Sequence, residues 1–158
     1  MWFVQVRRLV RWTTSKPLSK LNKTGEACKK AGIEFVYHNH ATEFAAVEGT
    51  TQTPYELIMA GTDKDLVKME LDMAWASKGG KDPIALFKEH PGRFPLWHIK
   101  DISADFKTIT EVGNGSVDFK RVFKEAKLAG MKHFFVEQDM VASFDSVQTS
   151  FTNLNKMI

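Results

Sequence analysis

Four short apolar runs recur along this 158-residue chain, and each ends in polar residues that can bind a hard metal ion. Continuous apolar runs of this length are typical of strands buried on both faces of a parallel sheet. The carboxyl ends of parallel strands meet at one edge, where α/β folds place their active sites, so we expect the polar ends to converge. These ends are His38-Asn39-His40, Glu70-Leu71-Asp72, His98-Ile99-Lys100-Asp101 and Glu137-Gln138-Asp139.

Helical patterns separate these runs. Predicted strands at 33–37, 66–73, 94–99 and 133–136 alternate with predicted helices at 17–32, 55–60, 84–89, 118–130 and 144–157. Thr53-Pro54 and Asp82-Pro83 are cap-plus-proline starts of two of the helices. Strand and helix together repeat about every 30 residues, the length of a βα unit with a right-handed crossover, which predicts a parallel α/β sheet.

Composition and motifs exclude several other classes. A chain with 43% hydrophobic and 26% charged residues is globular. Its net charge of +3 is scattered, so we expect no nucleic-acid partner. The single cysteine, Cys28, excludes an internal disulfide and a thiolate cluster. Arg7, Arg8 and Arg11 interrupt the apolar first dozen residues, so we expect neither a membrane span nor a signal peptide, and a cytoplasmic protein.

Each polar strand end also has an ordinary structural explanation. Asp72 could cap a loop, and His98 could be a satisfied core histidine. Lys100-Asp101 could form a solvated turn. Glu137 is harder to explain this way, because a buried carboxylate costs several kcal/mol unless a cation or a donor answers it. Four such ends together favour a divalent ion with oxygen and nitrogen ligands, namely Mn²⁺, Mg²⁺, Co²⁺ or Zn²⁺.

Five ordered motifs resemble the sugar phosphate isomerase/epimerase family of xylose isomerase-like TIM barrels. The resemblance covers about residues 18–158 and implies a partial (β/α)8 barrel, with about four parallel strands corresponding to barrel strands 5–8 and flanking helices. Residues 17–158 would then form the C-terminal half of the barrel, and residues 1–16 stay unplaced. The motifs are Tyr37-His38-Asn39-His40-Ala41-Thr42-Glu43-Phe44, Glu70-Leu71-Asp72, Leu96-Trp97-His98-Ile99-Lys100-Asp101, Val112-Gly113-Asn114-Gly115 and Val136-Glu137-Gln138-Asp139.

The resemblance implies one divalent ion bound by Asp72, His98, Glu137 and a ligand from barrel strand five. Many relatives have Glu at the strand-five position where this chain has His38. Either His38 replaces that Glu, or Glu43 reaches in from the following loop while His38 and His40 face the substrate. We favour Glu43 as the fourth ligand.

The implied activity is isomerisation or epimerisation of a sugar or sugar phosphate, through an enediolate beside a metal-chelated carbonyl. Glu137 would remove the proton, and Glu43, His38 or His40 would return it. Lys100, oriented by Asp101, would stabilise the developing oxyanion. The alternatives are a catalytically silent half-barrel, or a metal-dependent dehydratase or abasic-site endonuclease of the same fold.

Half a barrel would leave two open sheet edges and an exposed inner face. We therefore expect either a fragment of a longer gene product or a half-barrel that completes itself as a homodimer.

Overall fold

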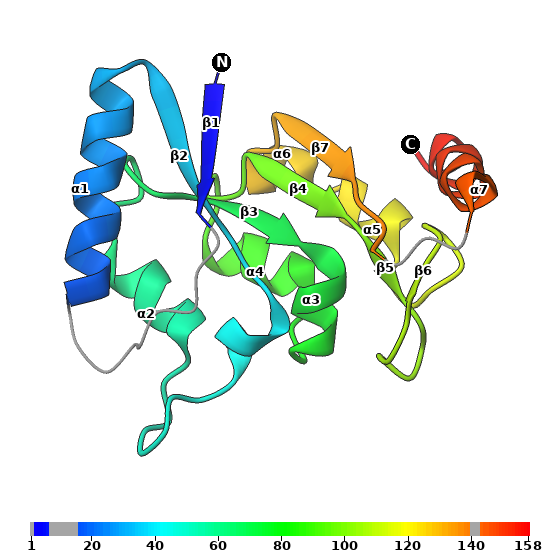
Figure 1. Cartoon of the computed structure of the whole chain (residues 1–158), viewed down its shortest axis with the longest axis horizontal. Coiled ribbons are helices and arrows are strands. Elements are labelled where there is room, and N and C mark those ends of the chain that lie inside the picture. The colour runs from blue at the N-terminus through cyan, green and yellow to red at the C-terminus, as the bar shows by residue number, and fades with distance from the viewer. Residues whose placement is uncertain (1, 7–15, 140–142) are drawn as a thin grey trace.

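A five-stranded parallel sheet forms the centre of the computed structural model, which describes residues 2–6, 16–139 and 143–158 (Figure 1). The strand order is β1-β2-β3-β4-β7. These strands are β1 (Trp2–Val6), β2 (Ile33–His38), β3 (Lys68–Asp72), β4 (Leu96–Ile99) and β7 (His133–Val136). The predicted α/β half-barrel is confirmed. It has one more strand than expected, because β1 pairs in parallel with β2 from within the segment left unplaced.

Helices connect the strands, but two of them were not predicted: Ala41–Phe44, and Met73–Lys78, which begins at the last residue of the predicted strand 66–73. The single helix expected after Asp118 is two short helices, and the second ends at Gly130 in the left-handed conformation that favours glycine (φ 78°). The helices are α1 (Lys16–Lys30), η1 (Ala41–Phe44), α2 (Pro54–Gly61), α3 (Met73–Lys78), α4 (Pro83–Glu89), α5 (Phe119–Phe123), α6 (Ala126–Ala129) and α7 (Phe144–Asn155).

The two faces of the sheet have opposite character. Leu71 and Trp97 are paired across β3 and β4 and are fully buried, and the ring of Trp97 stacks on Phe87 of α4 at 5.1 Å between centroids. Because successive side chains in a strand point to opposite faces, their neighbours Asp72 and His98 point to the other, inner face. The apolar core between the sheet and the helices therefore fixes the strands, and the strands fix the polar side chains on the inner face.

The long connection after β4 is a small hairpin of β5 (Asp101–Ile102) and β6 (Ile109–Thr110). The Asp101 carboxylate accepts hydrogen bonds from the backbone N–H groups of residues 102, 113, 115 and 117, at 2.9 to 3.1 Å. At Gly115 the backbone comes so close that an added Cβ would lie 2.2 Å from Asp101 Oδ1. Asp101 thus organises this loop and does not orient Lys100 as the sequence suggested.

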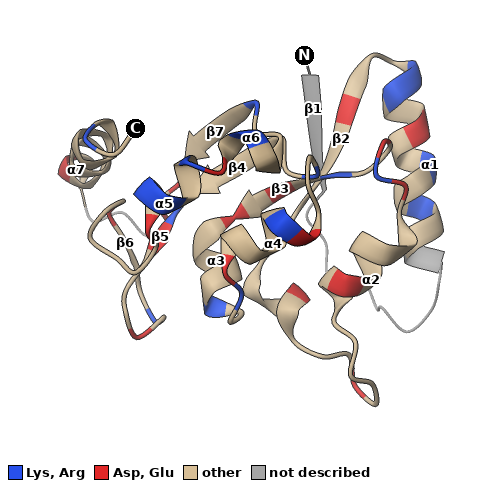
Figure 2. Ribbon diagram, turned by 180° about the vertical axis from the view of Figure 1, so that it is seen from behind, with Lys and Arg blue, Asp and Glu red and all other residues tan. Residues whose placement is uncertain are grey.

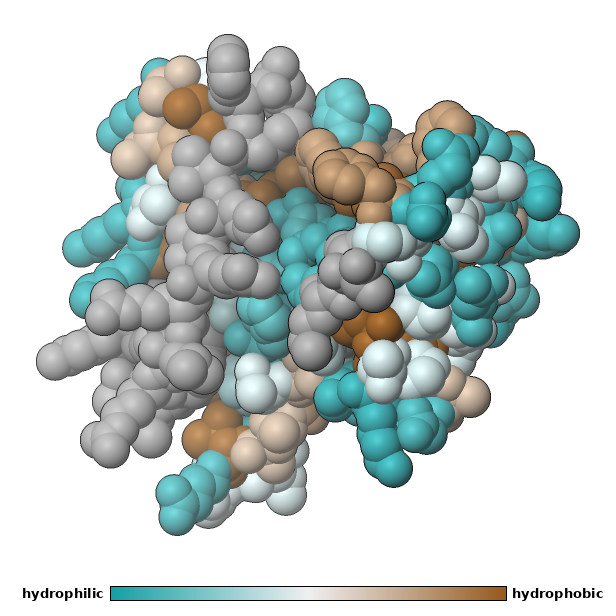
Figure 3. Space-filling model, turned by 45° about the vertical axis from the view of Figure 1, so that its right-hand side comes forward, coloured by the Kyte–Doolittle hydropathy of each residue, from teal (hydrophilic) through white to brown (hydrophobic). Residues whose placement is uncertain are grey.

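The surface mixes charges of both signs, with basic residues on α1, α4 and α5 interspersed with acids (Figure 2). The expectation of no nucleic-acid partner stays a prediction. Among the described helices, none combines the length and apolar character needed to cross a bilayer. Hydrophilic residues lie at the centre of the face in Figure 3, with hydrophobic residues beside them. Exposed large apolar side chains include Phe135 and Val136 of β7 and Phe144 and Phe151 of α7.

Candidate metal centre

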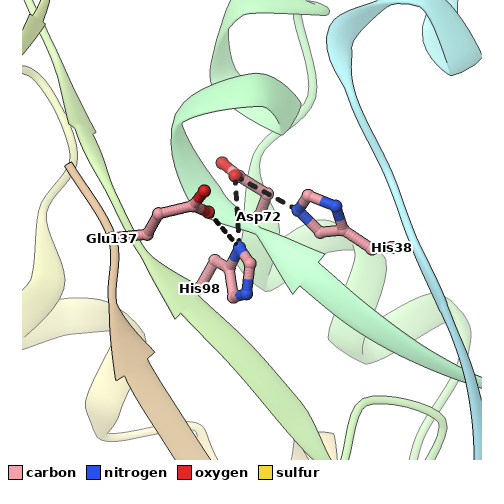
Figure 4. Close-up of side chains that lie close together, drawn as sticks. All are labelled: His38, Asp72, His98 and Glu137. Carbon is pink, nitrogen blue, oxygen red and sulfur yellow. Dashed lines mark hydrogen bonds and ion pairs between the residues drawn. The ribbon is translucent and has the colours of Figure 1, made fainter. Parts of the chain in front are cut away.

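Four side chains at the carboxyl end of the sheet converge on one point (Figure 4). His38 ends β2, Asp72 ends β3, His98 lies on β4 opposite Asp72, and Glu137 directly follows β7. Each offers one ligand atom, and these four atoms all lie within 4.8 Å of one another. The structure therefore brings together three of the four ligands predicted from the sequence, Asp72, His98 and Glu137, and adds His38.

The nitrogen and oxygen atoms of this group lie close enough together to share one cation. His98 Nδ1 and Glu137 Oε2 are both buried and lie only 2.5 Å apart. Asp72 Oδ2 lies 3.7 Å from His98 Nδ1 and 3.3 Å from His38 Nε2. Buried charged groups are either paired with one another or coordinate a metal ion, and a group packed this closely can do both. Two imidazoles and two carboxylates are a donor set suited to a divalent ion.

The two oxygens of Asp72 have different tasks. Oδ1 accepts a hydrogen bond from Trp75 N at 3.0 Å and caps helix α3, while Oδ2 faces His38 and His98. Burial alone would raise the pKa of Asp72. The hydrogen bonds with His38 and His98 and the charge of Lys100 nevertheless hold that pKa well below its usual range. Asp72 therefore caps a helix through one oxygen and is a candidate metal ligand through the other.

Glu70 holds the far side of the His98 ring, with Glu70 Oε1 2.9 Å from His98 Nε2. This contact fixes the ring with Nδ1 directed at the group, the arrangement that carboxylates behind ligand histidines provide in metal sites. Burial lowers the pKa of His98, but hydrogen bonds to Asp72 and Glu70 and the negative charge around it outweigh burial and raise that pKa to about 9. Glu70 was not predicted as a site residue, although alternation along the strand places it on the same face as Asp72.

Lys100 lies beside the group with a fully buried side chain. Its Nζ is 2.8 Å from Asp139 Oδ2, 3.1 Å from Glu137 Oε2 and 3.3 Å from Asp72 Oδ2, and it lies 5.3 Å from the centre of the Trp75 ring. Asp139, which also received no role from the sequence, makes the shortest of these contacts. Its position two residues after Glu137 places both acids at one strand end.

Glu43 lies outside the group of four. Its Oε1 accepts a hydrogen bond from Tyr37 OH at 3.0 Å, and its Oε2 accepts from His40 N at 2.8 Å and from Thr42 Oγ1 at 3.1 Å. These bonds cap η1 and engage both oxygens of the carboxylate. The structure thus offers His38, not the favoured Glu43, as the fourth ligand. His40 lies at the margin, with its ring centroid 5.0 Å from that of His38 and 6.0 Å from that of Trp75.

Comparison with known proteins places the chain in a family. The profile of the xylose isomerase-like TIM barrel matches residues 12–144, most of the chain. The chain belongs to that family. The resemblance expected from its motifs is therefore confirmed.

Relatives of known name share the same barrel half. A crystal structure of a sugar phosphate isomerase/epimerase from Parabacteroides distasonis superposes with a TM-score of 0.84 at 32% identity, over 96% of this chain and 56% of that one. An inosose dehydratase from Geobacillus kaustophilus is 29% identical over 81% of this chain and 45% of its own length. A crystal structure of IOLI protein with a bound zinc atom shares the fold (TM-score 0.70, 17% identity, 99% and 62% covered). The chain thus spans about half the length of the relatives it matches.

Proposed function

We propose that this xylose isomerase-like chain carries the metal-binding half of an enzyme that moves a proton on the carbon next to a sugar carbonyl. The observation that supports this most strongly is the convergence of His38, Asp72, His98 and Glu137 from four parallel strands. The family and the names of the relatives support a sugar or a related cyclic polyol as the substrate class.

The four residues would hold one divalent ion. Two nitrogen and two oxygen donors suit Mn²⁺, Zn²⁺ or Co²⁺ better than Mg²⁺, which prefers an all-oxygen shell. A relative of the same fold holds zinc. When bound, such an ion polarises a carbonyl and so acidifies the adjacent C–H bond.

Side chains of the chain itself would carry the proton. Glu137 is the most accessible of the four, with 29% of its side chain exposed, and only its Oε2 contacts the cationic groups of His98 and Lys100 among the described residues. Its other oxygen takes the proton from the carbon, and the electron pair of that C–H bond moves to the carbonyl oxygen. Lys100 stabilises the charge that develops there. In an epimerisation, His40, at the margin, would donate a different proton to the opposite face of the carbon, and Glu137 would pass the first proton to solvent.

The fate of the proton decides between the reactions that the relatives' names suggest. Return to the same carbon from the opposite face is epimerisation, and transfer to the neighbouring carbon is isomerisation. Loss of a hydroxyl group from the next carbon, with a proton, releases water and is dehydration. All three begin with the same proton removal, and isomerisation or epimerisation is our first choice.

A second candidate function is metal binding without turnover by this chain alone. It is favoured by the 45% and 56% of the relatives' lengths that the chain spans. It is also favoured by the exposed apolar residues Phe135 and Val136 on the edge strand β7. Completion of the barrel by a second copy stays a prediction, for which size-exclusion chromatography with light scattering is the measurement. A stable, highly soluble monomer would contradict it.

Two measurements test the proposal. Isothermal titration with MnCl₂ and ZnCl₂ should show one site in the wild type that is lost in Asp72→Asn and kept in the surface variant Asp105→Asn. Assays for ketose C3 epimerisation, aldose–ketose isomerisation and inosose dehydration, each with and without chelator, then identify the reaction. Chelator-sensitive turnover supports an enzyme, and metal binding without turnover supports the second candidate. Cleavage of an abasic oligonucleotide would overturn the choice of substrate class.

A further inference from the structure

Lys100 places a permanent positive charge against the candidate metal ligands. Its side chain is fully buried, and a buried ammonium requires carboxylate partners. Two of its three partners, Asp72 Oδ2 and Glu137 Oε2, are the oxygens that also approach His98 Nδ1. The ammonium and a divalent ion would therefore share the same two oxygens.

Two cations that share oxygens repel one another at short range, and more strongly in a buried site than in water. The repulsion falls if the ammonium has a partner of its own outside the ligand group. Asp139 is that partner. Its Oδ2 makes the shortest contact to Nζ, at 2.8 Å, and it is absent from the four converging residues.

Asp139 is also placed to keep this role without binding the ion itself. It lies two residues beyond Glu137 at the more open rim, with 40% of its side chain exposed, whereas Asp72 is fully buried. The Trp75 ring, 5.3 Å from Nζ, gives the ammonium a further favourable contact away from the ligand oxygens.

We propose that Asp139 is a positioning residue that draws the Lys100 ammonium away from the metal ligands and so sets the metal affinity of the site. The inference rests on the proposed function, because it assumes that the four residues bind an ion. It assigns Lys100 a second role, as a built-in competitor for the oxygens of Asp72 and Glu137. Asp139 restrains that competitor.

Calorimetric titration of MnCl₂ into four proteins tests this: wild type, Asp139→Asn, Lys100→Met and the double variant. Asp139→Asn should bind Mn²⁺ roughly tenfold more weakly, because the Lys100 ammonium is then left with the ligand oxygens as its only carboxylate partners. An effect of this size is typical of the coupling between two groups in contact. Lys100→Met should bind more tightly than wild type. The double variant should recover the affinity of Lys100→Met, since Asp139 then has nothing to restrain.

Controls separate this role from general effects of charge and folding. Asp105→Asn removes one exposed acid from the turn of the β5–β6 hairpin and should leave the Mn²⁺ affinity unchanged. Circular dichroism checks the fold of each variant. Lys100→Gln replaces Lys100→Met if the methionine variant does not fold. Equal weakening by Asp139→Asn with and without Lys100 overturns the inference and leaves the proposed function intact. A wild type that binds no Mn²⁺ overturns both.

Discussion

Raising the pH in the presence of a chelator should destabilise this protein through His98. The ring lies between three carboxylates, with Nε2 at 2.9 Å from Glu70 and Nδ1 beside Glu137 and Asp72. Although burial favours the neutral ring, these acids favour the imidazolium and raise its pKa from 6.5 to about 9. The folded state therefore binds this proton more tightly than the unfolded chain does.

The size and direction of the effect follow from that difference. At about 1.4 kcal/mol for each pH unit, the protonated His98 contributes about 3 kcal/mol to the free energy of unfolding. A raised pKa gives a contribution that is fully present below the unfolded value of 6.5 and is lost as the pH rises through about 9. Its side chain is only 12% exposed, so solvent screening reduces this little.

Urea denaturation followed by circular dichroism measures the loss, at about pH 6 and about pH 9.5 in EDTA. His98→Gln is the matched control, because every other titrating group is retained. The wild type should lose about 3 kcal/mol more than the variant between the two pH values. An equal loss in both proteins would refute the assignment of a charged His98. Mn²⁺ affinity should rise over the same range, since binding must displace the Nδ1 proton.

Four further substitutions test the site and the loop beside it. Glu43→Gln should leave Mn²⁺ affinity within about twofold, whereas His38→Gln should lower it at least tenfold, because only His38 lies among the converging donors. Glu70→Gln should weaken Mn²⁺ binding by about 10- to 100-fold by releasing the His98 ring. Gly115→Ala should reduce the free energy of unfolding by about 1–3 kcal/mol, because the new methyl group would meet the Asp101 carboxylate.

Calorimetry checks the three variants of the site, and urea denaturation checks Gly115→Ala. If Glu43→Gln abolishes binding and His38→Gln does not, the fourth ligand is misassigned. Glu89→Gln, an exposed acid on helix α4, is the control for Glu70→Gln. A Gly115→Ala protein as stable as wild type would show that the loop relaxes around Asp101.

The fold was predictable because apolar runs and helix caps report local structure. Thr53 and Asp82 cap the two helices that were predicted from their cap-plus-proline pairs. The strands end where the polar residues begin. The strand Trp2–Val6 was not predicted, since its pairing with β2 is a long-range contact that no local pattern encodes. The unexpected break between α5 and α6 likewise has no glycine or proline to signal it.

The site was predictable where strand geometry alone determines direction. Asp72 and His98 follow from alternation along their strands, and Glu70 could have been found by the same rule. Glu43 could not be placed, because its direction depends on the hydroxyl of Tyr37 and the backbone of His40, which meet only in the folded turn.

The two oxygens of the Asp72 carboxylate have different partners, and this limits how many bonds the protein could make to an ion. With Oδ1 engaged by the first turn of α3, this residue can coordinate through a single oxygen only. The four side chains would then supply one donor atom each, and an ion that takes about six ligands would have about two positions for other ligands. Two neighbouring oxygens of a polyhydroxylated carbonyl compound are the number needed to fill them.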